Sequence, residues 1–87
     1  MTTKGEYRVG TTFNPSSDDT VAIIKSMAAA LIDEIDTIPE RVAGLHGEET
    51  DDTRANERAR LKALAQTAIE EGAMWAVKAA TKPASFD

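Results

Sequence analysis

The sequence contains no cysteine, which excludes disulfide bonds and thiolate metal sites. Its one histidine, His46, stands in the segment GLHG, where no partner for metal binding or base catalysis is evident. Without a Cys nucleophile or a second His, no nucleophile–base pair can be assembled. Zinc-protease spacing and phosphate-binding glycine loops are also missing. We therefore expect a binding protein, with no catalytic residues, no metal and no cofactor.

Long apolar runs are absent as well. No stretch approaches the roughly 18–20 consecutive apolar residues of a membrane span, and MTTKGEYRVG at the start does not resemble a secretory signal. We expect a soluble, cytoplasmic protein. Basic residues are also few: the chain has 15 acidic and 10 basic residues, which gives a net charge of −5. This balance disfavours long nucleic acids, which need a broad basic surface, but it is compatible with a small anionic ligand.

Aromatic side chains are few. Two Phe, one Tyr and one Trp stand among 87 residues, and much of the 41% hydrophobic fraction is alanine. A chain of this length forms one domain and buries a limited share of its surface. A two-helix hairpin with so few large side chains needs additional burial, so we expect a homo-oligomer with a shared core.

One long helix is predicted from Arg60 to Pro83, because glycine and proline are missing except for Gly72 until Pro83 ends the pattern. Its apolar residues recur at steps of three and four, which places them on one face. They are Leu61, Leu64, Ala65, Ala68, Ile69, Gly72, Trp75, Ala76 and Ala79. A glycine inside a helix costs about 1 kcal/mol relative to alanine. We therefore expect Gly72 to mark a close helix–helix contact.

A second helix is predicted to begin near Ser16–Ser17, after the turn residues Asn14 and Pro15. Its apolar residues follow a heptad-like seam of Val21, Ile24, Ala28, Leu31, Ile35 and Ile38. Ile23, Met27 and Ile32 widen this seam, as the core helix of an oligomer requires. Pro39 either ends this helix or starts a short one that reaches Leu45. After the acidic turn EETDD, Thr50 or Asp52 is predicted to cap the segment 53–60 that opens the long helix.

Residues 1–17 are predicted to form an N-terminal arm, either ordered or a disordered tail, with no regular structure assigned. Tyr7 and Phe13 either pin this arm to the helices or stack on a planar ligand while the nearby Lys4 and Arg8 neutralise phosphates. The chain then divides into the arm, a helical hairpin domain at 18–83 and a frayed tail at 84–87. The predicted fold is an all-α helical hairpin with a long C-terminal helix.

Two stretches of the sequence resemble a known family. FNPSSDDTVAIIKSMAAALIDEI, residues 13–35, and RLKALAQTAIEEGAMWAVKAATKP, residues 60–83, are similar to the small bacteriophage anti-CBASS proteins. That family shares its helical-hairpin domain with the anti-Thoeris sponges. The run MWAVKA is the most specific part of the match, and the first stretch is the weaker half.

The resemblance implies a phage protein that assembles as a compact homohexamer in the cytoplasm of the infected bacterium. Such a protein sequesters cyclic oligonucleotide second messengers, uncleaved, and so blocks CBASS immunity. The family has one kind of pocket for cyclic dinucleotides, between paired protomers, and another for cyclic trinucleotides, at three-fold positions. The cyclic ADP-ribose signals of Thoeris are a further possible ligand class.

The resemblance also assigns residues. A helix lysine that meets phosphate matches Lys25, and an N-terminal aromatic that stacks on a base is either Phe13, next to Asn14, or Tyr7. Arg8 is a further phosphate contact on chemical grounds. Arg60 and Thr67 are candidates for the trinucleotide pocket. The acids Asp18 and Asp19 disfavour phosphate at the helix start, so either they point away or the dinucleotide site is altered.

Two other classes of function compete with this hypothesis. The first is a small helical phage oligomer that acts as a structural or protein-interaction module, with no nucleotide ligand. The second is a phosphodiesterase-like enzyme, which would require linear products or an essential metal. The absence of a metal-ligand motif and the isolation of His46 argue against the second.

Overall fold

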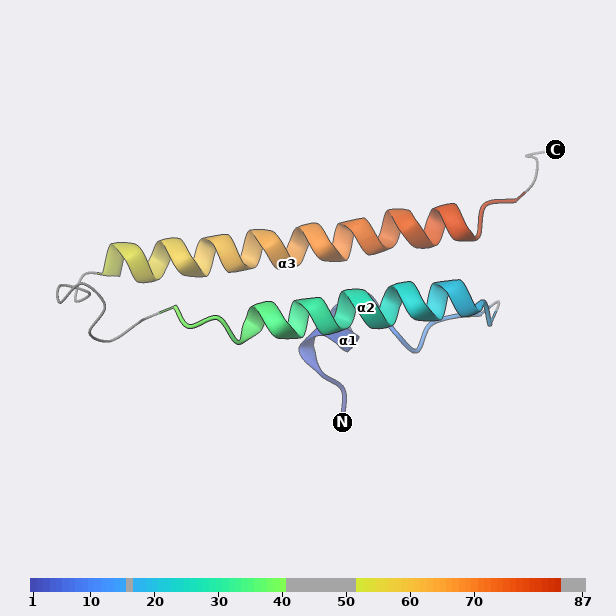
Figure 1. Cartoon of the computed structure of the whole chain (residues 1–87), viewed down its shortest axis with the longest axis horizontal. Coiled ribbons are helices and arrows are strands. Elements are labelled where there is room, and N and C mark those ends of the chain that lie inside the picture. Colours follow the sequence, from blue (N-terminus) through green and yellow to red (C-terminus); the bar gives the residue numbers. More distant parts are fainter. Residues whose placement is uncertain (16, 41–51, 84–87) are drawn as a thin grey trace.

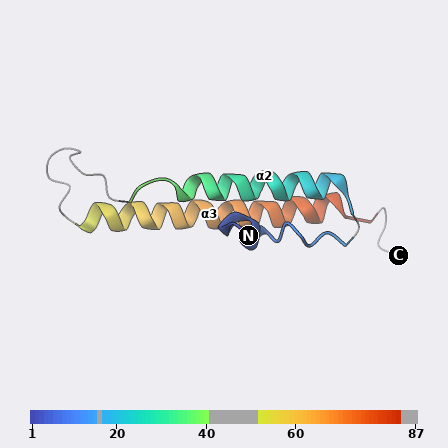
Figure 2. The same cartoon turned by 90° about the horizontal axis from the view of Figure 1, so that it is seen from below.

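The computed structural model describes residues 1–15, 17–40 and 52–83. Within these ranges the chain forms three helices and no strand: α1 (Lys4–Val9), α2 (Asp19–Asp36) and α3 (Asp52–Ala80). Helices α2 and α3 lie side by side and antiparallel (Figure 1), and α1 lies against one face of this hairpin near the middle of its length (Figure 2). The all-α hairpin with a long C-terminal helix is confirmed.

Helix α1 was not predicted, because no regular structure was assigned to the arm. Its start is a capping box, in which the Thr3 hydroxyl accepts from the Glu6 amide at 3.0 Å and the Thr3 amide donates to the Glu6 carboxylate at 2.9 Å. Gly10 ends the helix in the left-handed conformation, at φ 74°. Six residues are too few to display helical periodicity, so the T-x-x-E spacing was the available signal.

The close approach of two helices occurs at Gly5, not at Gly72. A Cβ on Gly5 would lie 2.1 Å from the Ala29 carbonyl oxygen, whereas one on Gly72 would meet no atom of the chain within 4 Å. The Gly5 amide also donates to the Asp33 carboxylate at 2.7 Å. Gly5 therefore lets α1 pack directly onto the backbone of α2, and the contact predicted at Gly72 does not occur within the described chain.

Helix α2 begins about two residues later than predicted. Asp18 is its N-cap, and its carboxylate accepts from the amides of Thr20 and Val21. The helix ends at Asp36, ahead of Pro39. The possible short helix to Leu45, the cap at Thr50, His46 and the tail at 84–87 lie outside the described residues.

The residues that the two long helices bury differ in part from the predicted ones. Helix α2 buries Val21, Lys25, Ala29 and Ile32, and α3 buries Ala55, Gln66 and Ala73. Of the predicted seam only Val21 is buried, while Leu31 remains 45% exposed. Ile32 is fully buried, whereas other large apolar residues such as Leu61 and Trp75 remain exposed.

Gln66 joins all three helices. Its amide nitrogen donates to the Ile32 carbonyl at 3.0 Å and to the Asp36 carboxylate at 3.3 Å, and its oxygen accepts from Lys4 at 3.1 Å. Lys4 also pairs with Asp36 at 2.7 Å. The hydrogen bonds from Lys4 and then Gln66 lower the pKa of the Asp36 carboxyl below its ordinary value of 3.8. This cluster fixes the position of α1 along the hairpin.

Candidate functional site

Two neighbouring pockets lie where α1, the segment after it, the first half of α2 and the last half of α3 meet. The larger, the Arg8 pocket, has a volume of about 500 Å³ and is lined by Arg8, Val9, Lys25, Thr67, Glu70, Glu71, Ala73, Met74 and Val77. The smaller, the Phe13 pocket, measures about 350 Å³ and is lined by Phe13, Asn14, Pro15, Val21, Lys25, Val77 and Thr81. Lys25 and Val77 line both, so the two pockets share a wall. Both volumes lie near the range of small-ligand sites.

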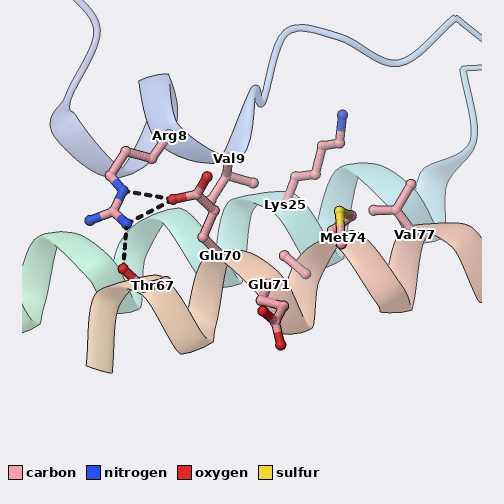
Figure 3. Close-up of a pocket in the computed structure, with 9 residues that line it drawn as sticks. Arg8, Val9, Lys25, Thr67, Glu70, Glu71, Met74 and Val77 are labelled. Carbon is pink, nitrogen blue, oxygen red and sulfur yellow. Dashed lines mark hydrogen bonds and ion pairs between the residues drawn. The ribbon is translucent and has the colours of Figure 1, made fainter. Parts of the chain in front are cut away.

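Arg8 is held in place by α3. Its Nε donates to the Glu70 carboxylate at 2.8 Å, its Nη2 lies 2.8 Å from the same oxygen, and Nη2 also donates to the Thr67 hydroxyl at 3.3 Å (Figure 3). The Arg8 side chain is 23% exposed. A guanidinium has five N–H donors, so these contacts orient the group and leave donors for an anion.

Lys25 is almost fully buried, at 7% exposure, although it carries a charge. Its ammonium donates to the carbonyl oxygens of Gly10, at 3.0 Å, and Phe13, and it lies 5.4 Å from the centre of the Phe13 ring. No described carboxylate forms an ion pair with it. Because an ammonium has three N–H donors, two are used by the turn after α1 and one remains.

The Arg8 pocket combines an apolar wall with charges of both signs. Val9, Met74 and Val77 supply the apolar surface beside the two cations, while the carboxylate of Glu71 points away from Arg8 and Lys25 (Figure 3). A ligand that carries both an anionic group and a flat, weakly polar surface matches this arrangement.

The structure brings some of the predicted site residues together. Arg8, Lys25 and Thr67 line the Arg8 pocket, and Phe13 and Asn14 line the Phe13 pocket with Lys25. Thr67, which the resemblance placed with the trinucleotide site, thus lies within hydrogen-bonding distance of Arg8, a candidate for the dinucleotide site.

Tyr7 and Arg60 lie apart from both pockets. Tyr7 is 82% exposed. Arg60 forms a two-pronged contact with Glu57, one turn earlier on α3, at 3.0 and 2.7 Å. Hydrogen bonding to Glu57 raises the pKa of the Arg60 guanidinium, which therefore stays charged. Since both partners are more than half exposed, the pair contributes little to stability.

Asn14 and Asp18 have local structural contacts. The Asn14 amide donates to the Asp18 carbonyl at 2.9 Å, and its oxygen accepts from the Asp18 amide at 3.2 Å. The Asp18 carboxylate accepts from the first amides of α2. The Asp18 carboxylate is thus directed to its own helix start, and Asn14 shapes the turn that carries Phe13.

Glu70 and Met74 were missed by the sequence analysis. Glu70 stands three residues after Thr67, which places both on the same helix face, but its pairing with Arg8 spans 62 positions of the sequence. Met74 lies outside the apolar face predicted for the long helix, and it is 55% exposed and lines the Arg8 pocket.

The described part of the chain contains neither a metal-ligand cluster nor a membrane-spanning helix. Residues 1–15, 17–40 and 52–83 contain no group of three His, Cys, Asp or Glu side chains suited to a metal ion. Within the same residues, no helix combines the length and hydropathy needed to cross a membrane.

Comparison with protein families matches residues 5–81 to the model described as "Acb2/Tad1, hairpin domain". The match covers α2, α3 and all of α1 except its first residue; the sequence stretches that carried the resemblance did not reach α1. Neither the curated proteins nor the solved structures gave a match.

Proposed function

The chain belongs to the Acb2/Tad1 hairpin domain family, and on that basis we propose that it binds cyclic oligonucleotide second messengers and holds them without cleavage. Membership implies sponge-type anti-defence, carried out by a binding domain. In this proposal the chain is a phage protein that acts in the cytoplasm of the infected bacterium. It sequesters the cyclic dinucleotides and cyclic trinucleotides that serve as CBASS signals, so that these signals do not reach their effectors.

One observation supports a cyclic nucleotide as the ligand above all others. In a chain of net charge −5, Arg8 and Lys25 line the same pocket, beside an apolar wall. A cyclic dinucleotide presents phosphates to cations and flat bases to apolar surface, and charge-assisted bonds to phosphate are strong. The free donors of Arg8 and the third N–H of Lys25 are the proposed phosphate contacts.

Phe13 is the aromatic that we propose stacks on a base, with Asn14 forming the adjoining turn. It is 71% exposed and lines a pocket together with Lys25, and base–aromatic stacking contributes about 1–3 kcal/mol per base. Tyr7, exposed on α1, is proposed to reach the ligand of a neighbouring protomer. Arg60 and Thr67 remain the proposed contacts of a trinucleotide held by several protomers.

A homo-oligomer, a hexamer by family resemblance, is part of the proposal. Large apolar side chains on both long helices, and one just after α2, are exposed in the single chain, at 45–68%. They are Ile23, Met27, Leu31, Ile38, Leu61, Leu64, Met74 and Trp75. Exposed apolar surface of this extent is typical of protein–protein contact.

The same exposed surface favours the alternative function, a helical interaction module with no nucleotide ligand. The two are separated by calorimetric titration with cyclic di- and trinucleotides and cyclic ADP-ribose, followed by chromatography of the ligand recovered after heat denaturation. Tight binding with intact ligand supports the sponge. No heat with any ligand, from a stable oligomer, supports the interaction module. Recovery of linear products would indicate an enzyme.

A further inference from the structure

The turn between α1 and α2 is attached to the hairpin through Lys25. Its ammonium bonds to the carbonyl oxygens at both ends of the segment from Gly10 to Phe13. The Gly10 carbonyl also accepts from the Phe13 amide at 3.0 Å. The turn is thus closed by its own backbone bond, and one side chain from α2 fixes it to the helix.

The burial of Lys25 explains why these bonds matter. A charged ammonium removed from water must be compensated by hydrogen bonds or opposite charge, and here carbonyl oxygens and the face of the Phe13 ring supply the compensation. If the turn moved away, the ammonium would lose these contacts. The turn and Lys25 therefore hold each other in place.

Phe13 has little other support. Its ring is 71% exposed, so packing alone does not fix its orientation. Within the described residues, Phe13 takes part in the turn hydrogen bond and in two interactions with Lys25. An aromatic surface that is fixed before binding loses less conformational entropy when a ligand stacks on it.

From this arrangement we infer that Lys25 is a positioning residue for Phe13, in addition to any contact with phosphate. It fixes the Gly10–Phe13 turn so that the ring forms the edge of the Phe13 pocket. The effect on ligand affinity rests on the proposed function. The effect on the turn is independent of it.

A double-mutant cycle tests the inference. Lys25→Met keeps the length of the side chain and removes the ammonium, and Phe13→Leu keeps an apolar side chain and removes the ring. Affinity for cyclic di-AMP is measured for the wild type, both single variants and the double variant. If Lys25 acts through Phe13, the two substitutions remove the same contribution to binding. The product of the two single fold-losses in affinity should then exceed the fold-loss of the double variant by at least about threefold.

Lys78→Met is the matched control. Lys78 also lies over an aromatic ring, at 5.6 Å from Trp75, but it lines neither pocket and is exposed. Its replacement should leave both the affinity and the turn unchanged.

Amide hydrogen exchange gives the second readout, and it needs no ligand. Lys25→Met should speed exchange of the Phe13 amide, while the Tyr7 amide, bonded to the Thr3 carbonyl at 2.9 Å within α1, should exchange as in the wild type. Faster exchange at both would indicate general loosening and would overturn a specific role in the turn.

The outcomes separate the two proposals. The positioning role is overturned if the two substitutions lower the affinity independently and the Phe13 amide of Lys25→Met exchanges at the wild-type rate. Binding of the ligand by the wild type would still support the proposed function in that case. If the wild type binds no cyclic nucleotide, the proposed function fails and the exchange experiment alone decides whether Lys25 fixes the turn.

Discussion

Replacement of Gly5 by alanine tests the docking of α1 most directly. The new Cβ would lie 2.1, 2.8 and 2.9 Å from the oxygen, carbonyl carbon and Cα of Ala29, all of them backbone atoms that cannot rotate aside. Helix α1 would have to move until these contacts reach the 3.4–4 Å of ordinary van der Waals contact. That movement would stretch the 2.7 Å bond from the Gly5 amide to Asp33 and the 2.7 Å contact between Lys4 and Asp36.

The expected cost is about 2–4 kcal/mol, from overpacking of about 1–3 kcal/mol and a weakened hydrogen bond to a charged group. This cost cannot exceed the free energy of docking α1 onto the hairpin, because a larger cost would detach the helix. For a domain of this size, a loss of 1 kcal/mol lowers Tm by about 4–8 °C. Thermal unfolding at fixed protein concentration should therefore show Tm lower by about 8–32 °C.

Gly72→Ala is the matched control. A Cβ there meets no atom within 4 Å, and alanine is favoured over glycine inside a helix by about 1 kcal/mol, so Tm should rise. An unchanged Tm for Gly5→Ala would refute the close packing of α1 on α2. A lower Tm for Gly72→Ala would indicate that a neighbouring protomer packs on this part of α3.

Three further predictions concern the ligand, pH and assembly. Arg8→Gln should weaken binding of cyclic di-AMP about tenfold or more through loss of a charge-assisted contact, whereas Lys82→Gln, exposed and outside both pockets, should not; equal affinities in a titration would remove Arg8 from the site. The pKa of Asp36 is lowered in the folded state, so its stabilising contribution is fully present above the ordinary value of 3.8 and is lost as pH falls through the lower pKa of the folded state. Asp36→Asn should therefore flatten the decline of Tm below pH 3.8. An identical decline in the variant and the wild type would contradict the Lys4–Asp36 contact. Trp75→Ala should shift the protein toward smaller species in sedimentation velocity, because Trp75 is 56% exposed in the single chain; an unaltered oligomer would show that this side chain lies outside the subunit contact.

Contacts between distant segments cannot be predicted from the pattern of neighbouring residues. Arg8 and Thr67 were predicted to line different pockets, yet the packing of α1 brings them within 3.3 Å of each other. Lys25 was predicted to contact phosphate, and in the fold its ammonium is bonded to carbonyl oxygens of the preceding turn. Periodicity identifies a face of a helix, but it does not say which of several apolar faces meets the partner helix and which remains exposed.

The sequence by itself determined the features that depend on neighbours within a few positions. Helical periodicity, the stop near Pro39 and the long uninterrupted segment ending before Pro83 determined an all-α hairpin, because these signals act through local backbone geometry. Only the tertiary structure decided that Gly5 is the point of close approach. It also decided which residues of the two long helices are buried, and that Arg8, Lys25 and Phe13 border neighbouring pockets. The position of the pockets depends on where α1 lies along the hairpin. That position is fixed by contacts between side chains 62 positions apart, Lys4 with Gln66 and Arg8 with Glu70.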